Sequence, residues 1–164
     1  MNEVYRELAE RIRGEAADLT RVVQRALHSW SRGQGLAAER DVYLESVALN
    51  LHAFYSGLER LFELIARHVD RVLPAGERWH HDLLQQMTKE MAETRPAVIS
   101  PDSASTLDEL RRFRHLVRNV YTFNLVPQKM EPLMSALPGL WQRVQAELAA
   151  FADFLEELAQ AGAT

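Results

Sequence analysis

Apolar residues recur every three or four positions along most of the chain, the spacing that places them on one face of an α-helix. Residues 4–30 carry one such stripe, and the two glycines within residues 31–35 are expected to end that helix. The clearest stripe follows, and residues 74–76 (Pro-Ala-Gly) should close it. Its apolar positions are Tyr43, Val47, Leu51, Phe54, Leu58, Leu61, Ile65, Val69 and Val72.

The middle of the chain predicts two further helices separated by a loop. The first is short and has apolar residues at steps of four: Trp79, Leu83, Met87 and Met91. Residues 95–103 contain two prolines and predict a loop. Thr106 followed by Glu109 is typical of a capping box, so the next helix is expected to start there and to stop before Pro127.

The last apolar stripe covers residues 130–158, with Pro138 and Gly139 expected to bend or divide the helix. No segment shows the alternation of a half-buried strand, and no internal repeat is present. The pattern therefore predicts an all-α fold, an antiparallel bundle of about five helices. We expect a single domain over residues 1–164.

Composition narrows the classes of chemistry that the chain could perform. There are no cysteines, which excludes disulfides, thiolate zinc sites and cysteine nucleophiles. The start of the chain is polar, and no apolar stretch reaches the roughly 20 residues of a membrane span, so we expect a cytoplasmic protein without membrane contact. The net charge of −4 means that any contact with nucleic acid requires a local basic patch.

Such a patch is predicted on the helix that follows residue 106. On a helical wheel one arc is apolar and must face the core: Leu110, Phe113, Leu116, Val117, Val120 and Phe123. The opposite arc collects Arg111, Arg114, His115, Arg118, Asn119, Tyr121 and Thr122. Arginines with an imidazole suit phosphate recognition and acid–base chemistry. The alternative is a solvated face, or one paired with acids such as Glu59 and Glu63 of another helix.

Residues 114–121, Arg-His-Leu-Val-Arg-Asn-Val-Tyr, resemble the signature of HEPN domains in the HepT-like branch. That signature is Arg, a polar residue, three further residues, His, one residue and Tyr. Residues 57–63, Gly-Leu-Glu-Arg-Leu-Phe-Glu, are similar to the long second helix of these proteins. The resemblance covers most of the chain, and the eight-residue motif is its specific part.

The resemblance implies a HEPN-like homodimer whose motif helices meet across a two-fold axis. It also implies a metal-independent endoribonuclease that needs no cofactor and acts as the toxin of a toxin–antitoxin pair. Arg114 would hold the scissile phosphate of RNA. The implied partner is a minimal nucleotidyltransferase antitoxin that uses ATP to adenylylate Tyr121.

The motif departs from the family pattern at one position, because Asn119 occupies the place of the catalytic His. Asparagine can hydrogen-bond to a phosphate or a 2′-hydroxyl, but it cannot carry a proton near pH 7. His115, one turn earlier, is the titratable candidate on that face. Two interpretations stay open: a nuclease whose catalytic set is Arg114, His115, Arg118 and Asn119, or an inactive HEPN subunit that docks on a nucleotidyltransferase or binds RNA.

Two other groups of residues could be mistaken for functional sites. Neighbouring residues on a helix point about 100° apart, so His80 and His81 are not expected to share a metal ion. His81 or Asp82 could instead line a cleft near the motif helix. The aromatic residues Tyr43, Phe54, Tyr55 and Phe62 are expected in the core, not on a platform that stacks bases.

Overall fold

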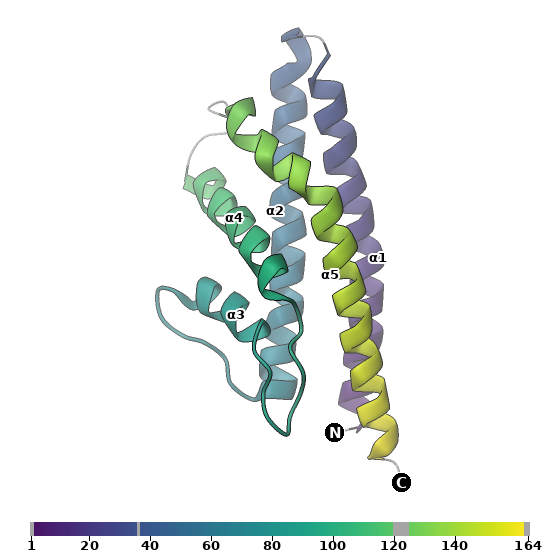
Figure 1. Cartoon of the computed structure of the whole chain (residues 1–164). Helices are drawn as coiled ribbons and strands as arrows, with labels where there is room; N and C mark the ends of the chain where they lie inside the picture. Colours follow the sequence, from purple (N-terminus) through teal and green to yellow (C-terminus); the bar gives the residue numbers. More distant parts are fainter. Residues whose placement is uncertain (1, 36, 120–124, 163–164) are drawn as a thin grey trace.

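The computed structural model describes residues 2–35, 37–119 and 125–162, without the side chains of residues 115–119. Three long helices run side by side, and two shorter ones lie against the flank of the second (Figure 1). Within the described residues the secondary structure is helical apart from one isolated β-bridge, which confirms the predicted all-α bundle. The helices are α1 (Asn2–Gly33), α2 (Arg40–Ile65), α3 (Trp79–Met87), α4 (Pro101–Asn119) and α5 (Pro127–Ala161).

Helix α2 is the centre of the bundle, because α1, α3 and α4 all pack against it. The ring of Phe54 in α2 also meets the edge of Trp141 in α5, with the ring centroids 5.5 Å apart. Most of the apolar stripe predicted for this helix is buried, from Val47 to Val69. Val72 is an exception and is 58% exposed, since a π-helix, Ala66–Asp70, ends the helical run two residues earlier.

The start of α4 differs from the prediction. The helix begins at Pro101, not at Thr106, because the Ser100 hydroxyl accepts a hydrogen bond from the backbone N–H of Ser103 at 3.2 Å. Proline at the first helical position and serine at the N-cap are a favourable combination. Glu147 of α5 accepts hydrogen bonds from the Ser100 backbone and from both serine hydroxyls, so the capped end of α4 is tied to α5.

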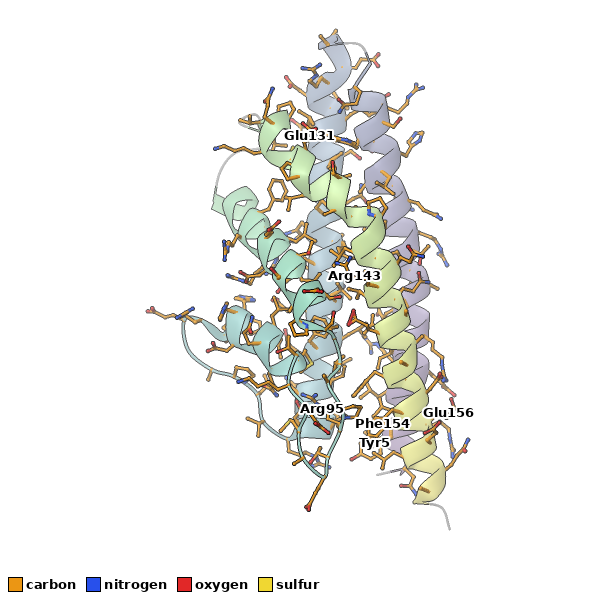
Figure 2. All side chains as sticks on the ribbon, viewed as in Figure 1. Tyr5, Arg95, Glu131, Arg143, Phe154 and Glu156 are labelled. Carbon is orange, nitrogen blue, oxygen red and sulfur yellow. The ribbon has the colours of Figure 1, made fainter. Side chains whose placement is uncertain are left out.

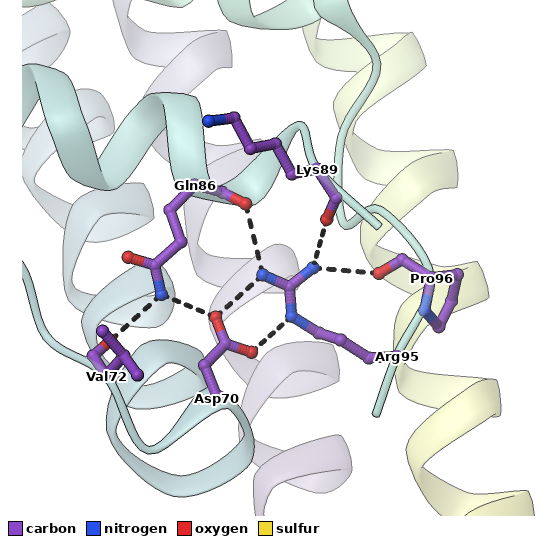
Figure 3. Close-up of polar contacts among 6 residues, drawn as sticks. All are labelled: Asp70, Val72, Gln86, Lys89, Arg95 and Pro96. Atoms are coloured by element: carbon purple, nitrogen blue, oxygen red, sulfur yellow. Dashed lines mark hydrogen bonds and ion pairs between the residues drawn. The ribbon is translucent and has the colours of Figure 1, made fainter. Parts of the chain in front are cut away.

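The predicted loop over residues 95–103 is anchored by a buried ion pair (Figure 3). The side chains of Arg95 and Asp70 are both fully buried. The guanidinium donates two hydrogen bonds to the Asp70 carboxylate, and three more to the backbone oxygens of Gln86, Lys89 and Pro96. A guanidinium has five N–H donors, so this network satisfies each of them.

Helix α5 runs without interruption through Pro132 and Pro138, so of the two outcomes expected at Pro138 and Gly139, a bend or a division, the structure excludes the division. Figure 1 shows the ribbon changing direction in this part, as proline inside a helix predicts. Near the chain ends α1 and α5 lie together. Tyr5 and Phe154 both pack on the core there (Figure 2), and Arg13 bonds Asp153 at 2.8 Å.

None of the helices, over the part of the chain that the structure describes, combines the length and apolar character needed to cross a bilayer.

The Arg95–Asp70 pair gives a stability prediction. Arg95→Met should lower the free energy of unfolding by about 3–5 kcal/mol, because it leaves the Asp70 carboxylate buried without its partner. The double variant Arg95→Met/Asp70→Leu should regain much of that loss, since no charge stays buried. Urea unfolding followed by circular dichroism measures both. A single variant as stable as the wild type would contradict the structural role of the pair.

Candidate functional site

Arg114 lies where α4 packs on α2, and its side chain is only 15% exposed. It forms an ion pair with Glu59 of α2, whose Oε1 is 3.5 Å from Nη1 of Arg114. The Nε–H of Arg114 is buried and has no hydrogen-bond acceptor among the described residues. Arg114 is therefore part of an interhelical contact, and the alternative that the basic face pairs with Glu59 holds for this arginine.

Glu59 is a charged residue on the buried side of α2, and the whole residue is 5% exposed. Placing a carboxylate there costs several kcal/mol unless partners compensate its charge. Two partners do so from two different helices. Oε1 faces Arg114 of α4, and Oε2 is 2.8 Å from Nδ1 of His80 in α3. One buried carboxylate thus joins the imidazole and the guanidinium.

The ring of His80 is held by one polar contact and one aromatic contact. Its Nδ1 is bonded to Glu59, and its ring lies against the indole of Trp79 with centroids 3.6 Å apart. The side chain remains 26% exposed. His81 and Asp82 instead contact each other at 3.5 Å, so His80 is the residue of the His80-His81-Asp82 run that the structure joins to Arg114. In the described part of the chain no group of three metal-ligating side chains is present.

The two arginines before Arg114 in the sequence are paired within α4. Asp108 accepts a hydrogen bond from Arg111 Nε and one from Arg112 Nη2, each at 2.8 Å. Burial raises the pKa of Asp108, but the hydrogen bonds and charges of the two arginines outweigh it and leave the pKa below its usual value. Much of the positive charge of this turn is therefore already compensated.

Tyr55 lies one turn before Glu59 on α2 and is 1% exposed. Burial, and next the charge of Glu59, raise the pKa of Tyr55 well above its ordinary value, so its hydroxyl stays protonated. The ring belongs to the core, as expected from the sequence. It feels the charges of Glu59 and Arg114, which together with His80 form the group that we call the Glu59 cluster: Glu59, His80 and Arg114.

Several predicted site residues lie outside the described part of the structure. His115, Arg118 and Asn119 belong to α4, but their side chains are not described, and Tyr121 lies in the undescribed residues 120–124. Among the predicted catalytic side chains, the structure therefore places Arg114. The sequence does not predict that His80 joins Arg114 through Glu59. The signal for this contact is Glu59 itself, because a charged residue on the face of α2 that also carries Tyr55 and Phe62 becomes buried and needs partners.

The lowered pKa of Asp108 predicts a pH dependence of stability. A depressed folded-state pKa contributes stability that is present above the unfolded value near 3.8 and is lost as the pH falls through the folded value. The Asp108→Asn variant should be less stable than the wild type at pH 6, and the two melting temperatures should converge as the pH falls below 3.8. Thermal melts from pH 6 to about 2.5 measure this, and a constant gap between the variants would contradict it.

Comparison with known proteins places the chain in a family. The family of HepT-like proteins matches residues 46–155, which include α3, α4 and the whole Glu59 cluster. No curated protein and no solved structure matches the chain. The family match covers well over half of the sequence and includes residues 114–121, where the motif of HEPN domains lies. The chain belongs to the HepT-like proteins of the HEPN superfamily.

Proposed function

We propose that this protein is the toxin of a toxin–antitoxin module and cleaves RNA without a metal ion. The observation that carries the proposal is the position of Arg114. It is the first residue of the HEPN motif, it lies inside the family match, and it contacts the same buried Glu59 carboxylate as the imidazole of His80. An arginine next to a histidine is a suitable pair for a phosphate and a moving proton.

The reaction would be an in-line attack by a ribose 2′-hydroxyl on the neighbouring phosphate. Negative charge grows on the phosphate oxygens in the transition state, and Arg114 and Arg118 would stabilise it. A single well-placed donor at such a position is worth roughly 3 kcal/mol. The 3.5 Å contact between Arg114 and Glu59 is longer than a charge-assisted hydrogen bond of about 2.8 Å, so the guanidinium keeps N–H donors for a phosphate.

The proposal includes a homodimer in which the two motif helices share one polar site. The motif residues His115 and Asn119 would complete that site, His115 as a titratable group and Asn119 as a hydrogen-bonding group. Isologous contact around a two-fold axis would bring both copies of Arg114 to the same region.

The partner in this proposal is a minimal nucleotidyltransferase antitoxin that adenylylates Tyr121. An AMP group on that hydroxyl carries a phosphate seven residues after Arg114 in the sequence. It would compete with RNA phosphate for Arg114 and Arg118. Neutralisation would then follow from occupation of the arginines, without a change of conformation.

A second function, that of an inactive binding subunit, is favoured by a different observation. Asn119 cannot replace the catalytic His as a proton carrier, and Arg114 already has an acid partner in Glu59. Such a subunit would dock on a nucleotidyltransferase, or bind RNA, without cleaving it. Cleavage assays separate the two functions directly.

The nuclease proposal gives a prediction for Arg114 in an RNA cleavage assay with EDTA present. Because this side chain is mostly buried beside Glu59, Arg114→Lys is a better test than Arg114→Ala, since it keeps a positive charge at the carboxylate. It loses the planar fork that binds phosphate, and cleavage should fall about 100- to 1,000-fold.

The matched control for Arg114→Lys is Arg112→Lys, whose side chain is 70% exposed and bonds Asp108. It should cleave at the wild-type rate. Asn119→His should cleave faster than the wild type, because it restores a proton carrier to the motif. Equal rates for Arg114→Lys and the wild type would show that the nuclease site lies elsewhere, and a wild-type protein that cleaves no RNA would favour the binding subunit.

The proposed modification gives a prediction for Tyr121. Co-expression with a minimal nucleotidyltransferase should add AMP to the peptide that contains Tyr121, and the modified protein should lose RNA cleavage. The variant Tyr121→Phe removes the acceptor hydroxyl and should carry no adduct. Peptide mass spectrometry measures the adduct, with Tyr43→Phe as the matched control. An adduct that persists in Tyr121→Phe would place the target of the partner enzyme on another residue.

A further inference from the structure

The Glu59 cluster contains a histidine that the HEPN motif does not supply. His80 comes from α3, about 30 residues before the motif, and its Nδ1 is 2.8 Å from Oε2 of Glu59. The other oxygen of the same carboxylate faces Arg114 at 3.5 Å. One buried carboxylate therefore contacts both the imidazole and Arg114, the arginine proposed to bind phosphate.

The contact with Glu59 decides which nitrogen of His80 can accept a proton. A carboxylate oxygen accepts a hydrogen bond, so Nδ1 carries the proton in the neutral ring and Nε2 keeps its lone pair. The stacked indole of Trp79 restricts the orientation of the ring. A carboxylate that fixes the tautomer of a histidine and stabilises the imidazolium is the arrangement that activates general bases in many hydrolases.

The two groups that a nuclease needs to expose are the two that remain partly accessible. The side chain of His80 is 26% exposed and that of Arg114 is 15% exposed, whereas Glu59, which links them, is 7% exposed. His81, the neighbouring imidazole, contacts only the exposed carboxylate of Asp82, at 3.5 Å, among the contacts of the described residues. The chain thus positions one histidine and leaves the adjacent one without a buried partner.

We infer that His80 is the general base of the nuclease, in place of the histidine that Asn119 replaces, with Glu59 as the residue that positions it. The inference rests on the proposed function. Nε2 of His80 takes the proton of the 2′-hydroxyl, and the 2′-oxygen forms a bond to phosphorus while Arg114 holds the phosphate. The bond from phosphorus to the 5′-oxygen breaks, and this oxygen takes a proton from water. The products are a 2′,3′-cyclic phosphate and a 5′-hydroxyl.

The test compares His80→Asn with His81→Asn in the full chain. The asparagine amide can donate to Glu59 from nearly the position of Nδ1, but it has no counterpart of Nε2, so the variant removes the base and keeps the buried hydrogen bond. The substrate is a 5′-labelled oligoribonucleotide of mixed sequence in EDTA, and the matching oligodeoxyribonucleotide controls for the 2′-hydroxyl. Thermal melting checks that both variants are folded.

We expect His80→Asn to lower kcat about 100- to 1,000-fold with KM within threefold of the wild type, and His81→Asn to keep the wild-type rate. In His80→Ala, added imidazole should restore part of the lost rate, because a small base can enter the space of the missing ring. Loss of a merely structural histidine would not be rescued in this way.

Three results would overturn the inference. Wild-type kcat in folded His80→Asn overturns it while the nuclease function stands, and His115→Asn would then be expected to lose activity in its place. A His80→Ala variant that is folded and slow but does not respond to imidazole reduces His80 to a structural role. A wild-type protein that cleaves no oligoribonucleotide contradicts the proposed function itself, and the role of His80 as a base falls with it.

Discussion

Burial of α2 on several sides is the constraint on which the rest of the structure depends. A helix that faces α1, α3 and α4 at once has little surface left for solvent, so a charged residue in its second half becomes buried. Glu59 is that residue. Its carboxylate must be compensated, and the compensation comes from His80 and Arg114, which lie on the two helices that cover this part of α2.

The segment between α3 and α4 is held by polar contacts in addition to the buried side chains of Val98 and Ile99. Arg95 reaches back to Asp70 at the end of the second helical run and to three backbone oxygens, and Glu147 binds the capped start of α4. These hydrogen bonds depend on direction, whereas apolar contacts allow neighbouring helices to slide past each other. The start of α4 is thereby fixed relative to both α2 and α5. Further along the same helix, the side chain of Arg114 reaches Glu59.

The helices could be predicted from the sequence because their signal is periodic and local. The three long apolar stripes predicted the helices that the structure shows as α1, α2 and α5. The start of α4 was misplaced, since Thr106 and Glu109 form a capping motif inside a helix whose N-cap is Ser100. Ser100 and Thr106 are both suitable N-cap residues, and Glu147 of α5, which lies 47 residues from Ser100 along the chain, hydrogen-bonds to the Ser100 backbone and so favours the earlier start.

The candidate site could be predicted in its residue types but only partly in its partners. The motif indicates Arg114, and the sequence offers Glu59, with Glu63, as an acid of another helix that pairs with the basic face. The sequence argues against a metal ion shared by His80 and His81, but it does not link His80 to Glu59, because that link depends on how α3 packs on α2. Sequence spacing places His80 and His81 on different faces, yet it does not indicate which face meets the buried carboxylate.

In the proposed nuclease, the shared carboxylate would let the chemistry differ from the motif without being lost. In the HEPN pattern one helix carries both the arginine and the proton carrier, so replacing the latter by Asn119 removes the base. Here Glu59 faces both α3 and α4, and the carboxylate that partly neutralises Arg114 can also orient an imidazole from another helix.

The negative charge of Glu59 would have opposite effects on phosphate binding and on proton transfer. It would weaken phosphate binding, because it reduces the attraction of Arg114 for an anion. It would favour proton transfer, because it stabilises the imidazolium that forms when His80 takes a proton. An arrangement of this kind would bind RNA less tightly than a bare arginine pair, while favouring the transition state over the ground state.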